Sequence, residues 1–252
     1  MTKMVLALAC GTALLLAQKQ PQPKSQKELE ALQALFQAPD PDSRIKAADT
    51  LISKFADTDF KAFALQVAAD SFRAKGDNEK AIIYAERAAE AEPGSIQAVQ
   101  AKLLIAEITV QGTRENDLDR EEKLTRVEKL AKEVQETLKT VAKPNPQLPD
   151  EQWEGVKKDL NSSTFEMVGM AAQVRKKHDV AITNFKLAVD AAASQGRPMA
   201  RLAAGLEQAG KPDEALAIVD KLSADPNLDP GLKPFLDQVK ARATKAKAAG
   251  AK

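Results

Sequence analysis

The residues that could carry out catalysis or bind a metal are few. The chain has one histidine, His178, and one cysteine, Cys10, so it lacks the second ligand or the paired base that a metal site or an activated nucleophile of the usual kind requires. His178 lies in a segment that we expect to be a turn between two helices. Carboxylates are abundant, but they alternate with lysine and arginine, as on solvated helix surfaces with weak ion pairs. The sequence therefore predicts no enzyme activity, no cofactor and no metal site.

The composition favours a helical protein. Hydrophobic residues make up 44% of the chain but aromatic residues only 4%, so the core must be built mainly from alanine and leucine, which favours close-packed helices over sheets. The 37 lysines and arginines balance 36 acidic residues, which argues against bulk attraction to nucleic acid or to an anionic membrane. Glycine is scarce and not clustered, so the sequence has no phosphate-binding loop.

Residues 60–93 predict two short amphipathic helices folded back on each other. Leu65, Ala69 and Phe72 recur at three- and four-residue spacing and form one apolar stripe. Gly76 can end this helix in the left-handed conformation, and Asp77 can cap the next helix. Two such helices cannot cover their own apolar surface, so similar pairs must pack on both sides of them. The stripe of the second helix comprises Ala81, Ile82, Ala85, Ala88 and Ala89.

These residues resemble the pattern of the tetratricopeptide repeat (TPR) family, whose large, small and aromatic positions are occupied here by Leu65, Ala69 and Phe72, followed by Ala81, Ala88 and Pro93. The resemblance implies an all-α fold, an α-solenoid of antiparallel helix hairpins (a TPR-like superhelix) with one expanded repeat and a C-terminal capping helix, in an exported bacterial protein. Four pairs of residues lie 34 positions apart, as this repeat length requires: Ala47 and Ala81, Phe165 and Met199, Ala181 and Ala215, and Ala188 and Leu222.

Residues 1–17 predict a secretory signal peptide. Lys3 precedes an apolar run from Met4 to Ala17, which as a helix would be about 21 Å long against about 30 Å of membrane hydrocarbon. Cleavage after Ala17 would remove Cys10 and leave a mature chain without a membrane span, exported to the periplasm or outside the cell. An uncleaved anchor, a lipoprotein modified at Cys10 and a buried N-terminal helix are the alternatives.

Prolines and shifts in composition divide the rest of the chain into segments. Whether the helix expected between residues 151 and 177 is continuous is open, because Asn161, Ser162 and Ser163 interrupt its pattern. In order, the segments are a polar linker (18–26), N-terminal TPR-like repeats (27–142) with a long helix (119–142), a proline-rich linker with an insertion helix (143–161), C-terminal TPR repeats with a capping helix (162–244), and a frayed basic tail (245–252).

Two features of the middle of the chain each have two interpretations. The helix at 119–142 has an apolar seam of about two and a half heptads, which favours packing on its own array over a homodimer through 119–142. Trp153, the only tryptophan, could mark a partner surface, but such a residue more often anchors an insertion to its scaffold. The residues of the seam are Leu124, Val127, Ala131, Val134, Leu138 and Val141.

The resemblance also implies a concave groove lined by the first helix of each hairpin. Family members that bind the C-terminal carboxylate of a chaperone have lysine and asparagine where this chain has Gln66 and Asp70, so we do not expect that mode of binding. A groove with both charges and apolar patches suits a peptide or helix lying along it. The expected groove residues are Phe63, Gln66, Asp70 and Arg73 in the second unit, Glu166, Met170 and Gln173 in the fourth, and Arg197, Ala200 and Glu207 in the fifth.

Together these features predict a non-catalytic interaction scaffold that is exported and binds a peptide or protein segment in its groove. Nucleic acid is not expected among its partners. Two other functions fit the sequence: a self-associating structural protein that uses the 119–142 helix, and an accessory subunit of an envelope assembly machine.

Overall fold

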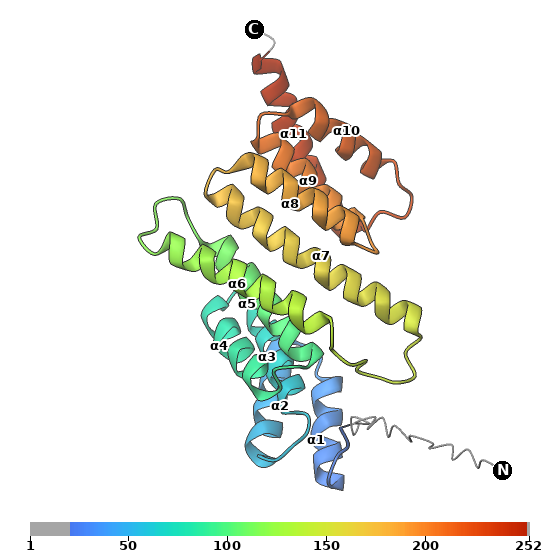
Figure 1. Ribbon diagram of the computed structural model, residues 1–252. Helices are drawn as coiled ribbons and strands as arrows, with labels where there is room; N and C mark the ends of the chain where they lie inside the picture. The colour runs from blue at the N-terminus through green and yellow to red at the C-terminus, as the bar shows by residue number, and fades with distance from the viewer. Residues whose placement is uncertain (1–20, 251–252) are drawn as a thin grey trace, which may run out of the picture.

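The computed structural model describes residues 21–250, and these residues form helices and connecting loops without a β-strand (Figure 1). The predicted signal peptide, residues 1–17, and the lipidation alternative at Cys10 lie outside the described residues. None of the helices in the described part of the chain is both long and apolar enough to cross a membrane. The helices are α1 (Gln26–Gln37), α2 (Pro41–Lys54), α3 (Lys61–Ala74), α4 (Asn78–Ala91), α5 (Ile96–Gly112), α6 (Arg120–Leu138), α7 (Asp150–Val174), α8 (His178–Ala191), α9 (Gly196–Gln208), α10 (Pro212–Ser223), the 3-10 turn η1 (Pro230–Leu232) and α11 (Lys233–Gly250).

The helices form an α-solenoid of antiparallel hairpins, as predicted. Each helix packs on the next one in the chain, and from α3 onward each odd-numbered helix also packs on the following odd-numbered helix. This pattern is that of stacked hairpins, in which a repeat contacts only its neighbours. Figure 1 shows the resulting stack, which runs from α1 at one end of the molecule to α11 at the other. Because α6 packs on α7 and α5 also packs on α7, the two predicted groups of repeats form one continuous array.

The turns within hairpins follow the local rules that the sequence indicated. Gly76 has φ 77° and ends α3, and the Asp77 side chain accepts a hydrogen bond from the Lys80 N–H at the start of α4. Gly210 has φ 73° in the equivalent turn between α9 and α10. The third such turn, between α7 and α8, has Lys176 in the same left-handed conformation, with φ 59°. A residue with a Cβ is strained there, whereas glycine is not.

The C-terminal half is built around the phenyl ring of Phe185, which is fully buried. A Cβ added to Gly169 on α7 would lie 2.6 Å from this ring, and one added to Gly205 on α9 would lie 2.7 Å from it. Phe185 comes from α8, so one ring fills the space between the backbones of two odd-numbered helices. The two glycines therefore set how closely α7, α8 and α9 approach each other.

The long helix expected at 119–142 ends at Leu138, so Val141 lies in the loop after it, but the apolar seam faces the interior of the array as the first interpretation predicted. Leu124, Val127, Ala131 and Val134 of α6 are at most 1% exposed, and Leu138 is 8% exposed. They pack against residues of α5 and α7. The seam is therefore covered within the chain and does not form an exposed surface.

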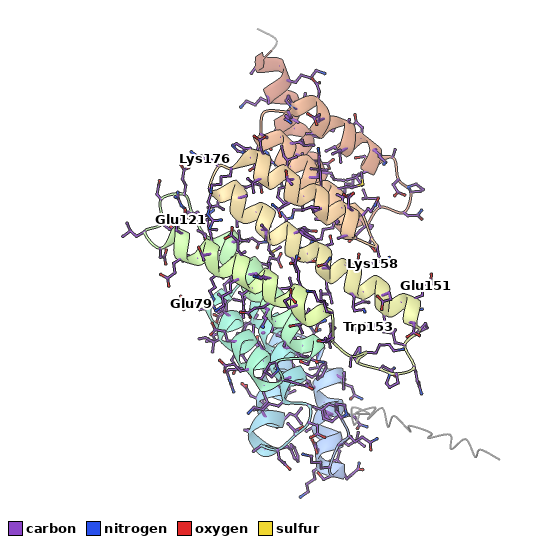
Figure 2. The ribbon with its side chains drawn as sticks, in the orientation of Figure 1. Glu79, Glu121, Glu151, Trp153, Lys158 and Lys176 are labelled. Carbon is purple, nitrogen blue, oxygen red and sulfur yellow. The ribbon has the colours of Figure 1, made fainter. Side chains whose placement is uncertain are left out.

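The helix α7 is continuous and is the longest in the described residues, with 25 residues from Asp150 to Val174. It passes through Asn161–Ser163 without a break, so the boundary expected between residues 161 and 162 falls inside one helix. Figure 2 shows Trp153 near the first turn of α7, where the chain arrives from α6. Trp153 is 5% exposed and packs with Ile96, Val99, Val134, Leu138 and Val141, so it anchors this end of α7 to the array.

The expectation of a frayed tail from residue 245 is wrong for the described residues, because α11 continues to Gly250. Leu236, Val239 and Ala243 form its buried stripe, as predicted for the capping helix. Beyond them the apolar period ends, but alanine and lysine are good helix formers. The Lys247 ammonium lies 2.6 Å from the Asp213 carboxylate of α10, which also holds this turn against the array.

A pair of glycine substitutions within α7 tests the role of the Phe185 ring. Gly169→Ala should destabilise the protein by about 1–3 kcal/mol, because the ring is blocked on its other side by α9 and cannot move away. Gly155→Ala is the control, since its added Cβ would meet only the Ala193 Cβ at 3.9 Å, and it should stabilise the protein by up to about 1 kcal/mol through helix propensity. Urea denaturation of both variants measures this, and equal effects would contradict the packing described.

The strained turn at Lys176 predicts a stabilising substitution. Lys176→Gly should raise the free energy of unfolding by about 0.5–1 kcal/mol, because glycine adopts a positive φ without strain. The ion pair that it loses, with Glu115, joins two side chains that are 64% and 52% exposed and contributes little. The reverse substitution, Gly210→Lys, should destabilise by a similar amount, as an added Cβ meets nothing within 4 Å there. Thermal and urea unfolding of the two variants should therefore shift in opposite directions.

Candidate functional site

The first helices of successive hairpins form one face of the array, which we call the odd-helix face and define as the exposed surface of α3, α5, α7 and α9. A pocket of about 260 Å³ lies on this face, and all of these helices contribute side chains to it. We call it the central pocket. Its lining residues are Gln66 and Asp70 of α3, Gln100, Leu103, Leu104 and Glu107 of α5, Leu160, Ser163 and Met167 of α7, and Arg197 of α9.

The α3 side of the central pocket is polar because Gln66 and Asp70 are one helical turn apart on the same face of the helix. The Gln66 Nε2 donates a hydrogen bond of 3.1 Å to the Asp70 Oδ1. The Gln66 side chain is 6% exposed, and its Oε1 has no hydrogen-bond donor among the described residues. Burial raises the pKa of Asp70, against the opposing effects of the Gln66 hydrogen bond and the Arg73 charge.

The α9 side of the pocket rests on a buried carboxylate. Glu166 of α7 is 1% exposed and accepts a hydrogen bond of 3.1 Å from the Arg197 Nε. The Arg201 Nε lies 3.9 Å from the same oxygen of Glu166. Burial raises the pKa of Glu166, while the charges of Arg197 and Arg201 lower it. Glu166 thus fixes the position of two arginines along α9.

A second charged group lies at the other edge of the pocket, between α3 and α5. The Arg73 Nη2 lies 3.3 Å from the Glu107 Oε1 and donates a hydrogen bond of 3.3 Å to the Gln111 Oε1. Gln111 in turn donates a 3.0 Å bond to Glu107. Arg73 is therefore already paired with a carboxylate, although its buried Nη1 has no acceptor among the described residues.

The structure brings some of the expected groove residues together and separates others. Gln66, Asp70 and Arg197 line the central pocket, and Arg73 and Glu166 pair with residues that line it. The other expected residues lie elsewhere: Phe63 stacks on Phe36 of α1 at 5.2 Å, Met170 is half-buried between two core clusters, Gln173 is half-buried near Gly205, Glu207 pairs with Arg242 of α11 at 2.9 Å, and Ala200 is buried under α10 and α11.

Sequence reasoning missed the contribution of α5, because the third unit departs from the family pattern. A signal for it was nevertheless present. Gln100, Leu104 and Glu107 lie 34 positions after Gln66, Asp70 and Arg73, so extending the repeat length by one unit would have selected three of the lining residues.

Sequence reasoning also missed Ser163, although its position in the repeat is that of Phe63 and Arg197. Ser163 lies as far before the turn residue Lys176 as Phe63 lies before Gly76 and Arg197 before Gly210. The positions of Leu160 and Leu103 in their repeats do not match those of the predicted groove residues. These two enter the pocket through the particular way in which α5 and α7 approach each other.

The described residues contain no group of three or more histidine, cysteine, aspartate or glutamate side chains arranged to hold a metal ion. His178 is the first residue of α8 and is half-buried, and its Nδ1 has no partner among the described residues. It lies in the hairpin turn outside the central pocket.

Comparisons with known proteins bear on the fold. No protein-family model matches the sequence, and no curated protein matches it. The fold is similar to the crystal structure of a thermophilic TPR protein from Thermus thermophilus, with a TM-score of 0.56. The match covers 88% of this chain and 98% of the Thermus protein at 16% sequence identity. This similarity shows that the chain has a TPR-like fold, as the repeat pattern implied.

The buried carboxylate predicts a pH dependence of stability. Because the folded-state pKa of Glu166 is raised above its ordinary value of 4.5, its ionisation opposes folding, and this cost is absent below pH 4.5, grows as the pH rises from 4.5 to the raised pKa and is constant above it. The stability of the wild type relative to Glu166→Gln should therefore fall as the pH rises from 4 to 8. Urea denaturation of both proteins across this range measures the difference. A difference that is constant or grows with pH would contradict this account of Glu166.

Proposed function

We propose that the protein is a non-catalytic interaction scaffold that binds a peptide or protein segment along its odd-helix face, with the central pocket as the main contact. The observation that carries this proposal is the pocket itself, since four successive first helices contribute to it and no single repeat could form it. Its mixture of apolar and charged side chains is typical of a site that holds a segment by side-chain insertion and orients it by polar contacts.

The polar groups of the pocket support binding further. The Asp70 carboxylate lines the pocket and accepts a hydrogen bond only from Gln66 among the described residues. A segment that supplies a further donor can pair with this carboxylate, so the binding of a polar group is favoured at this position. Because the pocket is set by packed helices rather than by loops, little ordering is needed when a segment binds.

Export is the second part of the proposal, and its support is in the sequence alone. The charged start and apolar run of residues 1–17 fit a cleaved signal, which would place the mature chain in the periplasm or outside the cell. A lone Cys10 that leaves with the signal would give a mature chain without thiols, which suits an oxidising compartment.

The alternatives have less support. A homodimer through 119–142 would have to use the charged outer face of α6, because the apolar seam is covered by α5 and α7. Exposed charged faces of this kind form weak ion pairs and seldom stabilise an association by themselves. A role as an accessory subunit of an envelope assembly machine is compatible with a peptide-binding scaffold and would follow from the identity of the partner.

Selection from a random peptide library displayed on phage tests the binding proposal. The purified protein should recover peptides whose affinity is lost when the pocket is filled by Ser163→Trp, since the Ser163 hydroxyl bonds only to the carbonyl of Asp159 in its own helix. Ser53→Trp is the matched control, because Ser53 is also a helical serine bonded within its own helix but lies on α2, outside the odd-helix face. Recovery of no peptide, or equal loss with both variants, would contradict the proposal.

A further inference from the structure

The charges around the central pocket are not evenly matched. Arg73 is paired with Glu107, and Arg197 is paired with Glu166. The Asp70 carboxylate, in contrast, has no lysine or arginine nitrogen within 4.0 Å among the described residues, although Arg73 acts on it from a greater distance. The lining of the pocket therefore holds one carboxylate whose charge is not matched by a direct ion pair.

The neighbour of this carboxylate is also an acceptor. Gln66 uses its Nε2 to donate to Asp70, so the Oε1 of the same side chain is the atom left without a donor. Two acceptors, one charged and one neutral, thus lie one helical turn apart on the α3 side of the pocket. A group that carries N–H donors and a positive charge can pair with the Asp70 carboxylate from the pocket, whereas the Gln66 Oε1 is buried behind it.

Besides Gln100, Glu107 and Ser163, four apolar side chains of α5 and α7 line the pocket. They are partly or fully buried, and a flexible aliphatic chain can lie against them without exposing new apolar surface. A pocket of about 260 Å³ is small for a folded element but large enough for one long side chain. The residues of this apolar wall are Leu103, Leu104, Leu160 and Met167.

We infer that the central pocket receives a lysine or arginine side chain of the bound segment, with its cation at the Asp70 carboxylate and its aliphatic stem against the apolar wall. This inference rests on the proposed function and names the chemistry of the side chain that the pocket selects. Arg201 does not compete for this position, because it lies towards α11, where its guanidinium is 5.3 Å from the Phe235 ring centre. Arg197, at the far edge, disfavours a second cation there and orients the segment.

The test uses the peptides recovered by display. Peptides that bind the wild type but not Ser163→Trp should share a lysine or arginine, and replacing it with norleucine, which keeps the stem and removes the charge, should weaken binding about tenfold or more. Asp70→Asn should weaken the same peptides by a similar factor. In the combined pair, Asp70→Asn with the norleucine peptide, the two losses should not add, because they remove one interaction.

A matched control and a charge reversal complete the experiment. Asp49→Asn changes a carboxylate that lines a shallow groove beside α2 and should leave the affinity unchanged. Asp70→Lys should recover acidic peptides in a fresh selection. Three outcomes for the peptides that bind the wild type but not Ser163→Trp would overturn the inference while leaving the binding proposal intact. The peptides could lack a common basic residue, they could share an acidic residue, or the losses from Asp70→Asn and norleucine could add. If no recovered peptide loses affinity for Ser163→Trp, the proposed function itself would be overturned.

Discussion

The structure depends on the close approach of neighbouring hairpins, each of which has more apolar surface than it can cover alone. The clearest case is the Phe185 ring, which fills the space between the backbones at Gly169 and Gly205. Aromatic side chains are rare in this chain, and alanines and glycines let the helices come near enough for a few large residues to bury fully. If the spacing at one interface changed, the parts of the array on either side of it would be repositioned, because each repeat is positioned only by its neighbours.

This spacing also creates the odd-helix face. Since α3, α5, α7 and α9 pack side by side, residues distant in the sequence, such as Asp70 and Arg197, line the same pocket. The buried Glu166 shows how the array controls charge, because it holds Arg197 and neighbours Arg201 on the next helix of the same face. Only Glu166 is buried in this pair, since the Arg197 side chain is 49% exposed, so the pair is weak support for stability but orients Arg197.

The middle of the chain shows how a repeat array accepts an expansion. The 25-residue α7 is nearly twice the length of α3 or α8, and its first turns extend past the regular repeat. Trp153 anchors this extension to α5 and α6, and the buried seam of α6 closes the gap between the two groups of repeats. One consequence is that Leu160, on a turn of α7 that precedes the regular repeat, adds to the apolar wall of the central pocket.

The sequence by itself determined the fold class, the hairpin turns and the stripe of each helix, because these depend on residue types three or four positions apart and on glycine or aspartate at helix ends. It also selected Gln66, Asp70 and Arg197, which fall on the groove side of their helices by repeat position. Only the tertiary structure decided that α7 is unbroken, that Glu166 is buried beside two arginines, and that Leu103 and Leu160 meet in one pocket. The reason is physical: the helical period sets which side chains share a face of one helix, whereas contacts between helices depend on how closely the packed hairpins approach.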